Sequence, residues 1–266
     1  MSIQFGIIGG GVMGEALLSR LLVQGLYESS EVLVSEPQPQ RRDFLASQYG
    51  VGITSDNQAV VEVAPTLLLA IKPQVFDAVT IALNQRHPNQ VILSILAGVP
   101  LARLEAAFPG QSVIRAMPNT PATVGAGVTA IAAGQHTQPE HLQLARQVFA
   151  AVGEVVEVPE SLLDAVTGLS GSGPGYIAVL IEALIDGGVA VGLPRSTATQ
   201  LALQTVRGTA ELLQTTGIHP AELKDRVTSP GGTTIAGIAQ LEQAGFRSAV
   251  IEAVRAACRR SQELGQ

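Results

Sequence analysis

The sequence predicts an α/β protein in which a doubly wound sheet occupies the N-terminal part and helices alone form the C-terminal part. Two observations predict this class. Short apolar runs alternate with helical segments through roughly the first half of the chain, as a doubly wound sheet requires. Strand signals then stop beyond Pro159, and the sequence that follows is helical.

Size and composition allow one large domain or two. The chain has 266 residues, of which 46% are hydrophobic, so it can bury a large core. We place the domain boundary where the strand signals end, so that residues 1–160 form the first domain and residues 161–266 the second.

The strands of the first domain are predicted from continuous apolar runs. Such runs, unlike alternating ones, indicate strands that are buried on both faces, as in a parallel sheet covered by helices. The candidates are residues 5–8, 32–34, 66–70, 91–94 and 113–116, with further short strands at residues 128–132 and 155–158.

Apolar helices dominate the second domain. We expect them at residues 176–193 and 196–213, with breaks at residues 171–174, 193–194, 217–220 and 229–232. Glu182 and Asp186 interrupt the first of these helices, which favours a buried helix over a membrane span. A helix that is apolar nearly all round needs partners on every side, and this favours an oligomer.

Charge and side-chain chemistry exclude several classes of partner. The net charge of −6 and the lack of a basic stripe argue against a nucleic-acid partner. Cys258 is the single cysteine and is interpreted as a small core residue, and the four histidines lack ligand spacing, so we assign no metal. The N-terminus lacks the pattern of a signal peptide, and we expect a cytoplasmic protein without a membrane partner.

Residues 9–14 contain the glycine spacing G-x-G-x-x-G, which is typical of a loop that binds a dinucleotide. We call them the first glycine loop. A predicted strand at residues 5–8 precedes the loop and a helical pattern follows it, which is the context that the motif requires. In such a loop Gly9 makes the tight turn, Gly11 lets the backbone approach the pyrophosphate, and Gly14 lets the helix pack on the sheet. The first domain is therefore predicted to be a Rossmann-type dinucleotide-binding domain.

The residues after the second predicted strand leave the choice of cofactor open. Glu36 ends this strand, where an acidic residue commonly accepts hydrogen bonds from the adenine-ribose hydroxyls of NAD. Arg41 and Arg42 follow, and they could instead pair with the ribose phosphate of NADP. A third alternative is that Glu36 is an exposed acid before Pro37.

Near the C-terminus, residues 227–234 place two adjacent glycines between hydroxyl residues. We call residues 229–234 the second glycine loop. Its glycines let backbone N–H groups turn toward a small anion, and we expect those of residues 232–234 to open a helix that begins near Ile235. The alternative is a tight turn that only caps the helix. A loop for a nucleotide and a loop for a small acid together suggest a redox enzyme.

Five motifs together resemble the pyrroline-5-carboxylate reductase family, and the match covers essentially the whole chain. They are GIIGGGVMGEALL at the start, AIKP at residues 70–73, RAMPNTP at residues 115–121, GSGPGY at residues 171–176 and LKDRVTSPGGTTIAGIAQLE at residues 223–242. The last motif is the signature of that family. The resemblance implies NAD(P)H-dependent reduction of 1-pyrroline-5-carboxylate to L-proline, the last step of proline biosynthesis. It also implies a Rossmann domain followed by an all-helical dimerisation and substrate-binding domain.

The resemblance also implies site residues, position by position. NADPH, with NADH as an alternative, would be bound by Gly9, Gly11, Val12, Met13, Gly14, Ser35, Glu36, Asn57, Ala70, Ile71, Lys72, Pro73, Ala97 and Gly98. The substrate carboxylate would be held by the loop that contains Ser229, Gly231, Gly232, Thr233 and Thr234. Thr234 is implied to lie near the ring nitrogen of the substrate. The active site is implied to be completed between the subunits of a homodimer, and the resemblance also allows a larger ring of dimers.

The chemistry agrees with these parts, because hydride transfer to an imine depends more on positioning than on a strong acid or a nucleophile. Lys72 is the second candidate catalytic residue, as a proton donor or an electrostatic partner of cofactor or substrate. A lysine before a proline at a strand end is as often a fixed loop charge. Asn119 and Thr120 are candidates that could equally be turn formers.

Two rival hypotheses remain. One is another imine reductase or a β-hydroxyacid reductase of the same architecture, but the hydroxyacid branch is expected to place a catalytic lysine on the first interdomain helix. Residues 162–185 contain no lysine. The other is a non-catalytic nucleotide-sensing protein, which would need the first glycine loop but not the second.

Overall fold

The computed structural model describes residues 2–83, 87 and 89–265, and it divides into two compact units. The first unit is Met1–Ser172 together with Ala256–Gln266, and the second is Gly173–Arg255. These units are compact parts of the fold. The predicted boundary between residues 160 and 161 instead divides a dinucleotide-binding domain from a substrate-binding domain, and it stays a prediction.

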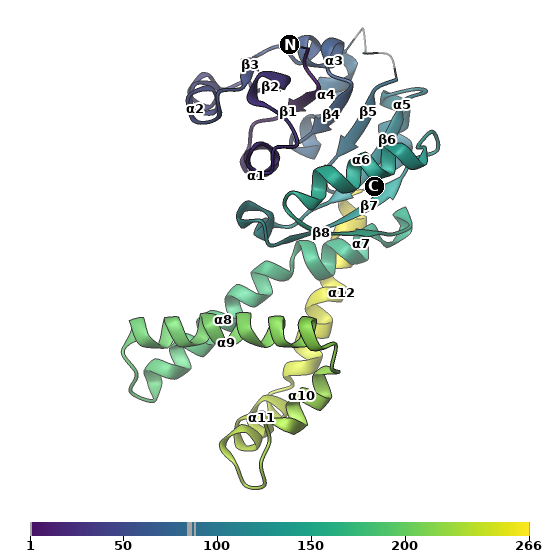
Figure 1. The fold of residues 1–266 in the computed structure, drawn as a ribbon. Helices are drawn as coiled ribbons and strands as arrows, with labels where there is room; N and C mark the ends of the chain where they lie inside the picture. The colour runs from purple at the N-terminus through teal and green to yellow at the C-terminus, as the bar shows by residue number, and fades with distance from the viewer. Residues whose placement is uncertain (1, 84–86, 88, 266) are drawn as a thin grey trace. The chain divides into compact units, whose positions relative to one another are not determined.

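A single sheet forms the centre of the first unit (Figure 1). Within the described residues its strand order is β3-β2-β1-β4-β5-β6-β7-β8, and only β6 and β7 pair in antiparallel orientation. The strands are β1 (Phe5–Ile8), β2 (Val32–Ser35), β3 (Gly52–Thr54), β4 (Thr66–Leu69), β5 (Val91–Ser94), β6 (Ser112–Met117), β7 (Gly127–Ala133) and β8 (Gly153–Glu157).

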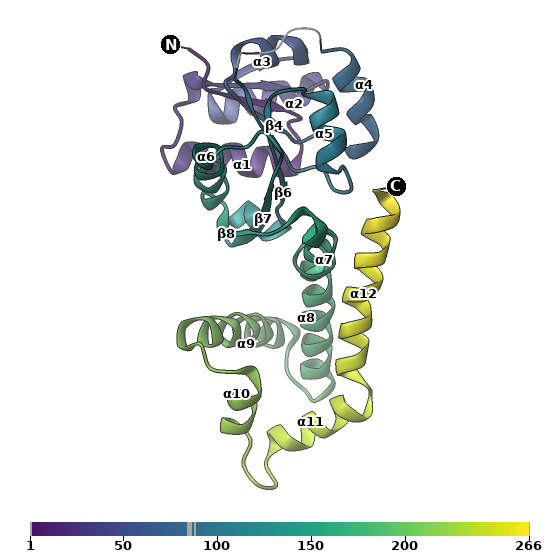
Figure 2. The same cartoon turned by 90° about the vertical axis from the view of Figure 1, so that its right-hand side faces the viewer.

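Helices cover both faces of this sheet, which makes it doubly wound as predicted. One apolar core lies under α1 (Val12–Val23), α2 (Pro39–Tyr49) and α6 (Pro139–Ala150). The other lies under α3 (Asn57–Val63), α4 (Phe76–Ile81), α5 (Leu101–Ala107) and α7 (Leu163–Val166). Figure 2 shows α4 and α5 on one side of the sheet and α1 and α6 on the other.

Short helical turns connect these elements. They are the 3₁₀ helices η1 (Ser29–Glu31), η2 (Pro73–Val75), η3 (Thr120–Val124) and η4 (Glu160–Leu162), and the π-helix η5 (Thr167–Gly171). The π-helix comes directly before the point where the chain enters the second unit. Its Ser172 N–H donates to the Thr167 carbonyl over 2.8 Å, a bond that spans five residues.

The strand order reverses between β1 and β4, because β2 and β3 lie on one side of β1 while β4 and β5 lie on the other. These strands are parallel, so their carboxyl ends meet at one edge of the sheet. In open α/β sheets, ligands bind in the crevice at such a switch point. We therefore expect a ligand to bind at the loops that follow β1, β2, β4 and β5.

In the part of the chain that the structure describes, five helices follow the π-helix: α8 (Gly173–Ala190), α9 (Arg195–Thr216), α10 (Pro220–Arg226), α11 (Thr233–Gln243) and α12 (Phe246–Leu264). The end of α12 belongs to the first unit and the rest of this segment to the second. In the second unit, α8 packs closely on α9 (Figure 1), and a Cβ at Gly188 would lie 3.0 Å from the Ala198 Cβ.

The apolar helix at residues 176–193 differs from the expectation of a buried helix. The structure places α8 at Gly173–Ala190, and within the described chain none of its residues is buried. Val179 is 67% exposed and Val191, just beyond the helix, is 83% exposed. By length and composition alone, the segment Glu160–Ala190 would be long and apolar enough to cross a membrane, although the core helices of soluble proteins also meet this criterion.

Candidate functional site

The first glycine loop lies at the carboxyl end of β1, and two of its glycines are required by packing. Gly9 has φ of +105°, and a Cβ there would lie 2.6 Å from the Ala70 carbonyl oxygen. A Cβ at Gly14 would lie 2.2 Å from the Gly9 carbonyl oxygen. At Gly11, by contrast, a Cβ would meet nothing within 4 Å. The space beside Gly11 is therefore open, as the approach of a pyrophosphate requires.

The same loop begins helix α1. Gly11 is its N-terminal cap, with extended backbone and without a side-chain hydrogen bond to the helix, and Val12 is 68% exposed. The first N–H groups of a helix have no partner within the helix, and the helix dipole favours negative charge at this end. An exposed, uncapped start beside an open glycine fits a phosphate-bearing ligand.

Glu36, after β2, turns inward toward the first glycine loop. Its carboxylate accepts the Gly10 N–H at Oε2 and the Gln38 N–H at Oε1, each over 3.0 Å. The residue is 8% exposed, so the alternative of an exposed acid before Pro37 is wrong. The buried Ser35 hydroxyl donates to Asn57 Oδ1 over 2.6 Å, and this brings Ser35 and Asn57 together at the same edge of the sheet.

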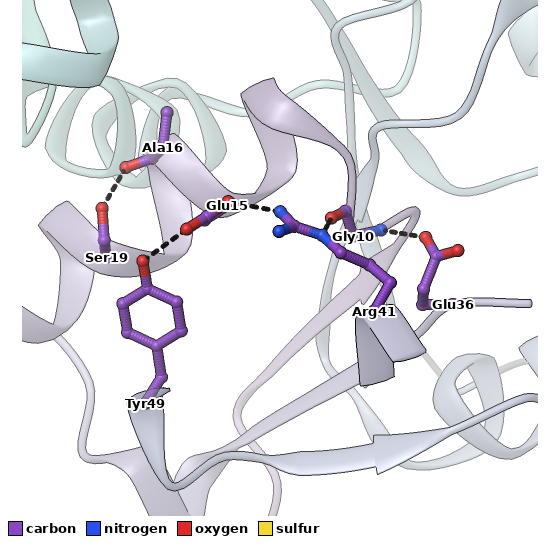
Figure 3. Close-up of polar contacts among 7 residues, drawn as sticks. All are labelled: Gly10, Glu15, Ala16, Ser19, Glu36, Arg41 and Tyr49. Atoms are coloured by element: carbon purple, nitrogen blue, oxygen red, sulfur yellow. Dashed lines mark hydrogen bonds and ion pairs between the residues drawn. The ribbon is translucent and has the colours of Figure 1, made fainter. Parts of the chain in front are cut away.

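Arg41 forms the centre of a polar network that also contains Gly10, Glu15, Glu36 and Tyr49, which we call the Arg41 network (Figure 3). Arg41 Nε donates to the Gly10 carbonyl over 2.6 Å, and another guanidinium nitrogen pairs with Glu15. The Tyr49 hydroxyl donates to the other oxygen of Glu15 over 2.7 Å. The partners come from the start of α1 and from both ends of α2, so the network ties these helices to the loop.

The network perturbs the ionisation of two of its members. Burial opposes ionisation of Glu15, but the hydrogen bonds from Arg41 and Tyr49 and the charge of Arg41 outweigh it, so the pKa of Glu15 is lowered. Burial, followed by the hydrogen bond to the Glu15 carboxylate, raises the pKa of Tyr49 to about 12. At neutral pH the network therefore contains an ionised Glu15 and a neutral Tyr49.

The loops after β4 and β5 supply the remaining predicted cofactor residues. The Ala70 N–H donates to the Ile8 carbonyl over 2.8 Å, so residues 70–73 continue beside the first glycine loop. Lys72 is exposed and forms no ion pair within the part of the chain that the structure describes. Gly98, next to Ala97, has φ of +74°, and a Cβ there would lie 3.3 Å from the Leu264 carbonyl oxygen.

The second glycine loop lies in the second unit and precedes α11. Gly231 has φ of +67°, and Gly232 is the N-terminal cap of the helix without a side-chain cap. The helix begins at Thr233, two residues earlier than expected, because the glycine cap lets it start directly after the turn. The Gly232 N–H donates to the Ser229 carbonyl over 3.0 Å and so is engaged within the loop, contrary to expectation. The predicted anion site at the start of the helix therefore narrows to the N–H groups of Thr233 and Thr234, and it stays a prediction.

Asn119 was predicted either as a candidate site residue or as a turn former, and the structure gives it a bridging position. Its Nδ2 donates to the Ser170 carbonyl in the π-helix over 3.2 Å, and its Oδ1 accepts the Val128 N–H over 2.9 Å. The Thr120 carbonyl accepts the Thr123 hydroxyl over 2.9 Å, a contact within the turn. Asn119 thus links the end of β6 to the segment that leads into the second unit.

Sequence reasoning missed Glu15 and Tyr49, and it also missed a polar cavity of about 360 Å³ in the first unit. The cavity is lined by Gly98, Pro100, Arg115, Asp164, Gln262 and Gly265. Arg115 is 8% exposed and pairs with Glu160 over 3.1 Å. The available signal was a charged residue inside the otherwise apolar run of β6, because such a residue is rarely buried without a partner.

Two family models match the chain. The model described as pyrroline-5-carboxylate reductase dimerisation matches residues 160–264, and the model described as NADP oxidoreductase, coenzyme F420-dependent, matches residues 4–98. A pyrroline-5-carboxylate reductase from Synechocystis is 60% identical over 266 residues, which cover 100% of both chains. The chain belongs to the pyrroline-5-carboxylate reductase family.

Solved structures agree with this assignment. A pyrroline-5-carboxylate reductase from Coxiella burnetii has a TM-score of 0.91 and 33% identity, with 100% of each chain covered. A pyrroline carboxylate reductase from Plasmodium falciparum with NADP bound has a TM-score of 0.90 and 28% identity, with 99% of this chain and 98% of that chain covered.

Membership of the pyrroline-5-carboxylate reductase family confirms the resemblance found in the sequence. It also confirms the Rossmann-type sheet followed by a helical C-terminal part, and the class of an NAD(P)-dependent oxidoreductase. Of the three functions that the sequence left open, the comparisons favour the cyclic-imine reductase over the hydroxyacid reductase and the nucleotide sensor. The roles of individual site residues stay predictions.

Proposed function

We propose that this reductase converts 1-pyrroline-5-carboxylate to L-proline with NADPH, the last step of proline biosynthesis. The observation that carries the proposal is the full-length similarity to pyrroline-5-carboxylate reductases. NADPH is favoured because the relative from Plasmodium falciparum has NADP bound. NADH stays an alternative donor.

The first glycine loop and its neighbours fit a dinucleotide. The open space beside Gly11 and the exposed start of α1 support a pyrophosphate position at Gly9, Gly11, Val12, Met13 and Gly14. Ser35 ends β2, Glu36 follows it and Asn57 begins α3 after β3. Ser35 is hydrogen-bonded to Asn57 and Glu36 to Gly10, which supports an adenine-ribose position at this edge. Residues 70–73 with Ala97 and Gly98 support a nicotinamide position at the ends of β4 and β5.

The second glycine loop fits the substrate carboxylate. We assign the carboxylate to the N–H groups of Thr233 and Thr234 at the start of α11, where the helix dipole also favours negative charge. Ser229, Gly231 and Gly232 shape the turn that leaves these N–H groups accessible. The loop would thereby fix the orientation of the substrate ring.

Reduction of the C=N bond needs a hydride at carbon and a proton at nitrogen. Bound NADPH supplies the hydride from its nicotinamide ring. The protein holds the reacting groups at a fixed distance, which can supply much of the rate acceleration. We assign the Thr234 hydroxyl to a hydrogen bond with the ring nitrogen. Lys72, whose ammonium is exposed at the end of β4, is the candidate that holds a proton or a balancing charge near the reacting atoms.

The helical region supports a homodimer. Large apolar side chains of α8 and α9 are exposed within the described chain, among them Val179, Leu184, Leu201 and Leu203. Contiguous exposed apolar surface commonly marks a protein interface. The family model that matches residues 160–264 is a dimerisation model, and we therefore propose residues 161–266 as the dimerisation and substrate-binding domain and residues 1–160 as the dinucleotide-binding domain. A larger ring of dimers stays an alternative.

We also propose a cytoplasmic protein without nucleic-acid or membrane partners, and the net charge of −6 supports the absence of a nucleic-acid partner. We propose that the apolar segment Glu160–Ala190 is covered by the second subunit and not by lipid. Light scattering and cell fractionation test both points. A stable, active monomer would contradict the shared site, and recovery in the membrane fraction would contradict the location.

The decisive assay for function is the oxidation of NADPH followed by absorbance, with and without 1-pyrroline-5-carboxylate. We expect oxidation only with the imine, and formation of proline in equal amount by mass spectrometry. A small β-hydroxyacid with NADP serves as the control for the rival hydroxyacid chemistry. Turnover of the hydroxyacid, or cofactor binding without turnover of the imine, would contradict the proposal.

A further inference from the structure

We propose that Arg41 is the residue with which this reductase recognises the 2′-phosphate of NADPH, and that Glu15 sets how strongly NADPH is preferred to NADH. The inference rests on the proposed use of a nicotinamide cofactor. It concerns the Arg41 network of Figure 3, whose side chains gather beside Gly10.

The position of Arg41 suits a contact with the adenine ribose. The residue lies near the start of α2, just after Glu36, where the adenine ribose is expected. Its Nε donates to the Gly10 carbonyl over 2.6 Å, and its guanidinium carbon lies 5.0 Å from the centre of the Phe44 ring. These contacts fix the side chain beside the first glycine loop, yet it remains 26% exposed. A fixed and partly accessible guanidinium suits recognition of a phosphate.

Glu36, the acid nearest the expected ribose, is held by backbone N–H groups. An acid at this position discriminates for NAD by accepting the ribose hydroxyls. Here both carboxylate oxygens of Glu36 already accept backbone N–H groups, from Gly10 and from Gln38, each over 3.0 Å. Each oxygen can accept a second hydrogen bond, so these contacts hold Glu36 beside the loop without excluding a ribose hydroxyl. A carboxylate repels a phosphate whereas a guanidinium binds it, so Arg41 is the group suited to a 2′-phosphate.

Arg41 retains hydrogen-bond donors for a ligand. A guanidinium has five N–H donors in a planar fork. Within the described residues, the Arg41 hydrogen bonds use Nε, which donates to Gly10, and one terminal nitrogen, which donates to Glu15. The other terminal nitrogen is left to donate to a phosphate oxygen. Arg41 can thus bind a 2′-phosphate without releasing Gly10.

Glu15 gives the network its second role. Its carboxylate is held between Arg41 and the Tyr49 hydroxyl, and it neutralises the arginine when no phosphate is present. With NADH bound, the arginine keeps this counter-ion. With NADPH bound, the phosphate and the carboxylate compete for one cation and repel each other. Glu15 therefore lowers the affinity for NADPH more than that for NADH, because specificity is the difference between the two affinities.

The test measures binding to the full-length protein without turnover. Adenosine 2′,5′-bisphosphate and adenosine 5′-monophosphate differ at the 2′-phosphate, and calorimetry gives a Kd for each. In Arg41→Ala we expect the preference for the bisphosphate to fall by about 10- to 100-fold, as for lost hydrogen bonds to a charged group. In Glu15→Gln we expect it to rise by roughly three- to tenfold, because a competing charge is removed.

Arg103→Ala is the matched control. Arg103 also pairs with a carboxylate, that of Asp77, and its guanidinium lies 5.4 Å from the centre of the Phe76 ring. It lies on α5, away from the residues of the Arg41 network in sequence and in partners. Its substitution should leave the preference for the bisphosphate within twofold or so of wild type, since it removes a similar pair that touches no network residue.

The ratio of kcat/KM for NADPH to that for NADH supplies a second readout and separates the two hypotheses. If wild type oxidises neither cofactor with the imine, or prefers NADH, the proposed use of NADPH is wrong. If wild type prefers NADPH and folded Arg41→Ala retains that preference in both assays, Arg41 is not the recognising residue. Should Arg41→Ala fail to fold, Glu15→Gln decides, because an unchanged ratio in that variant overturns the role of the network.

Discussion

Long-range contacts hold the first glycine loop, whereas the second is held by its own neighbours. In the first, the N–H and the carbonyl of Gly10 are bonded to Glu36 and Arg41, which lie 26 and 31 positions away. In the second, the Gly232 N–H bonds to the Ser229 carbonyl, and a Cβ at Gly232 would lie 2.4 Å from the Ser229 Oγ. The two loops have similar composition, but residues distant in the sequence hold the first and residues within the loop hold the second.

The difference separates glycines that the fold requires from glycines that a ligand requires. Gly9 and Gly14 are surrounded by backbone, which cannot move aside easily. Gly11 has open space, and the nearest neighbours of a Cβ at Gly232 belong to Ser229. Substitutions in the first loop should therefore divide into those that unfold the protein and those that remove binding, whereas substitutions at Gly232 and Thr234 of the second should act mainly on binding.

The largest effect is expected from placing valine at Gly14. Because even its Cβ would lie 2.2 Å from the Gly9 carbonyl oxygen, we expect a loss of about 3 kcal/mol or more in the free energy of unfolding. Gly11→Val is the matched variant, since Gly11 has an ordinary φ of −70° and open surroundings. It should unfold near the wild-type midpoint in urea but bind NADPH weakly. Equal stability of the two variants would show that Gly14 is not required by the fold more than Gly11 is.

Substitutions in the second glycine loop should change catalytic efficiency more than stability. Thr234→Ala removes the hydroxyl assigned to the ring nitrogen, and we expect kcat/KM for 1-pyrroline-5-carboxylate to fall by roughly 10- to 100-fold. Gly232→Val should reduce it further, because its Cβ would meet the Ser229 side chain and so shift the turn before Thr233 and Thr234, while the φ of −76° is accessible to valine. Thermal unfolding provides the control. If both variants keep wild-type kinetics, the loop is only a helix cap.

A smaller effect is expected at Glu36, which supports the first loop from the ribose side. Glu36→Ser removes a negative charge near the 2′ position, so the ratio of kcat/KM for NADPH to that for NADH should rise by roughly three- to tenfold. Glu36→Gln keeps an oxygen for the Gly10 N–H and removes only the charge. A ratio that stays at the wild-type value in both variants would show that the charge of Glu36 does not reach the cofactor.

The smallest effect is expected from the ionisation of Glu15. Its pKa is lowered in the folded protein, so it contributes stability above its ordinary value of 4.5, and this contribution is lost as the pH falls. Urea unfolding at pH 6 and at pH 3 should show that wild type loses more stability than Glu15→Gln. The difference should be below about 1 kcal/mol, because the pair with Arg41 is partly exposed. An equal loss in both proteins would show that the pair does not stabilise the fold.

The sequence was sufficient for the central strands because their burial is visible in the residues. Residues 5–8 and 91–94 are runs of apolar or small residues, and the structure forms β1 and β5 at those positions. β3 was missed because Gly52–Thr54 is a short edge strand with a glycine and partly exposed side chains. The antiparallel pairing of β6 with β7 was also missed. Its signal was the short connection through η3, which leaves no room for the crossover that a parallel pair needs.

The candidate site was only partly accessible from the sequence. A glycine motif with its flanking strand and helix is local, so the sequence located the first glycine loop. The direction of a side chain is not local, and nothing in the sequence shows that Glu36 turns toward Gly10 or that Tyr49 reaches Glu15 across 34 positions. The sequence also does not show that the Gly232 N–H donates to the Ser229 carbonyl, because this hydrogen bond depends on how the turn closes.

The contact between Tyr49 and Glu15 has an optical consequence. The chain has no tryptophan and three tyrosines, so tyrosine dominates its near-ultraviolet absorption and emission. Tyr176 donates to the Ala253 carbonyl, whereas Tyr49 donates to a carboxylate, a partner that shifts tyrosine absorption and quenches its emission. Any ligand that draws Arg41 away from Glu15 changes the charge beside the Tyr49 hydroxyl. The protein therefore contains an intrinsic spectroscopic reporter beside its first glycine loop, without an attached dye.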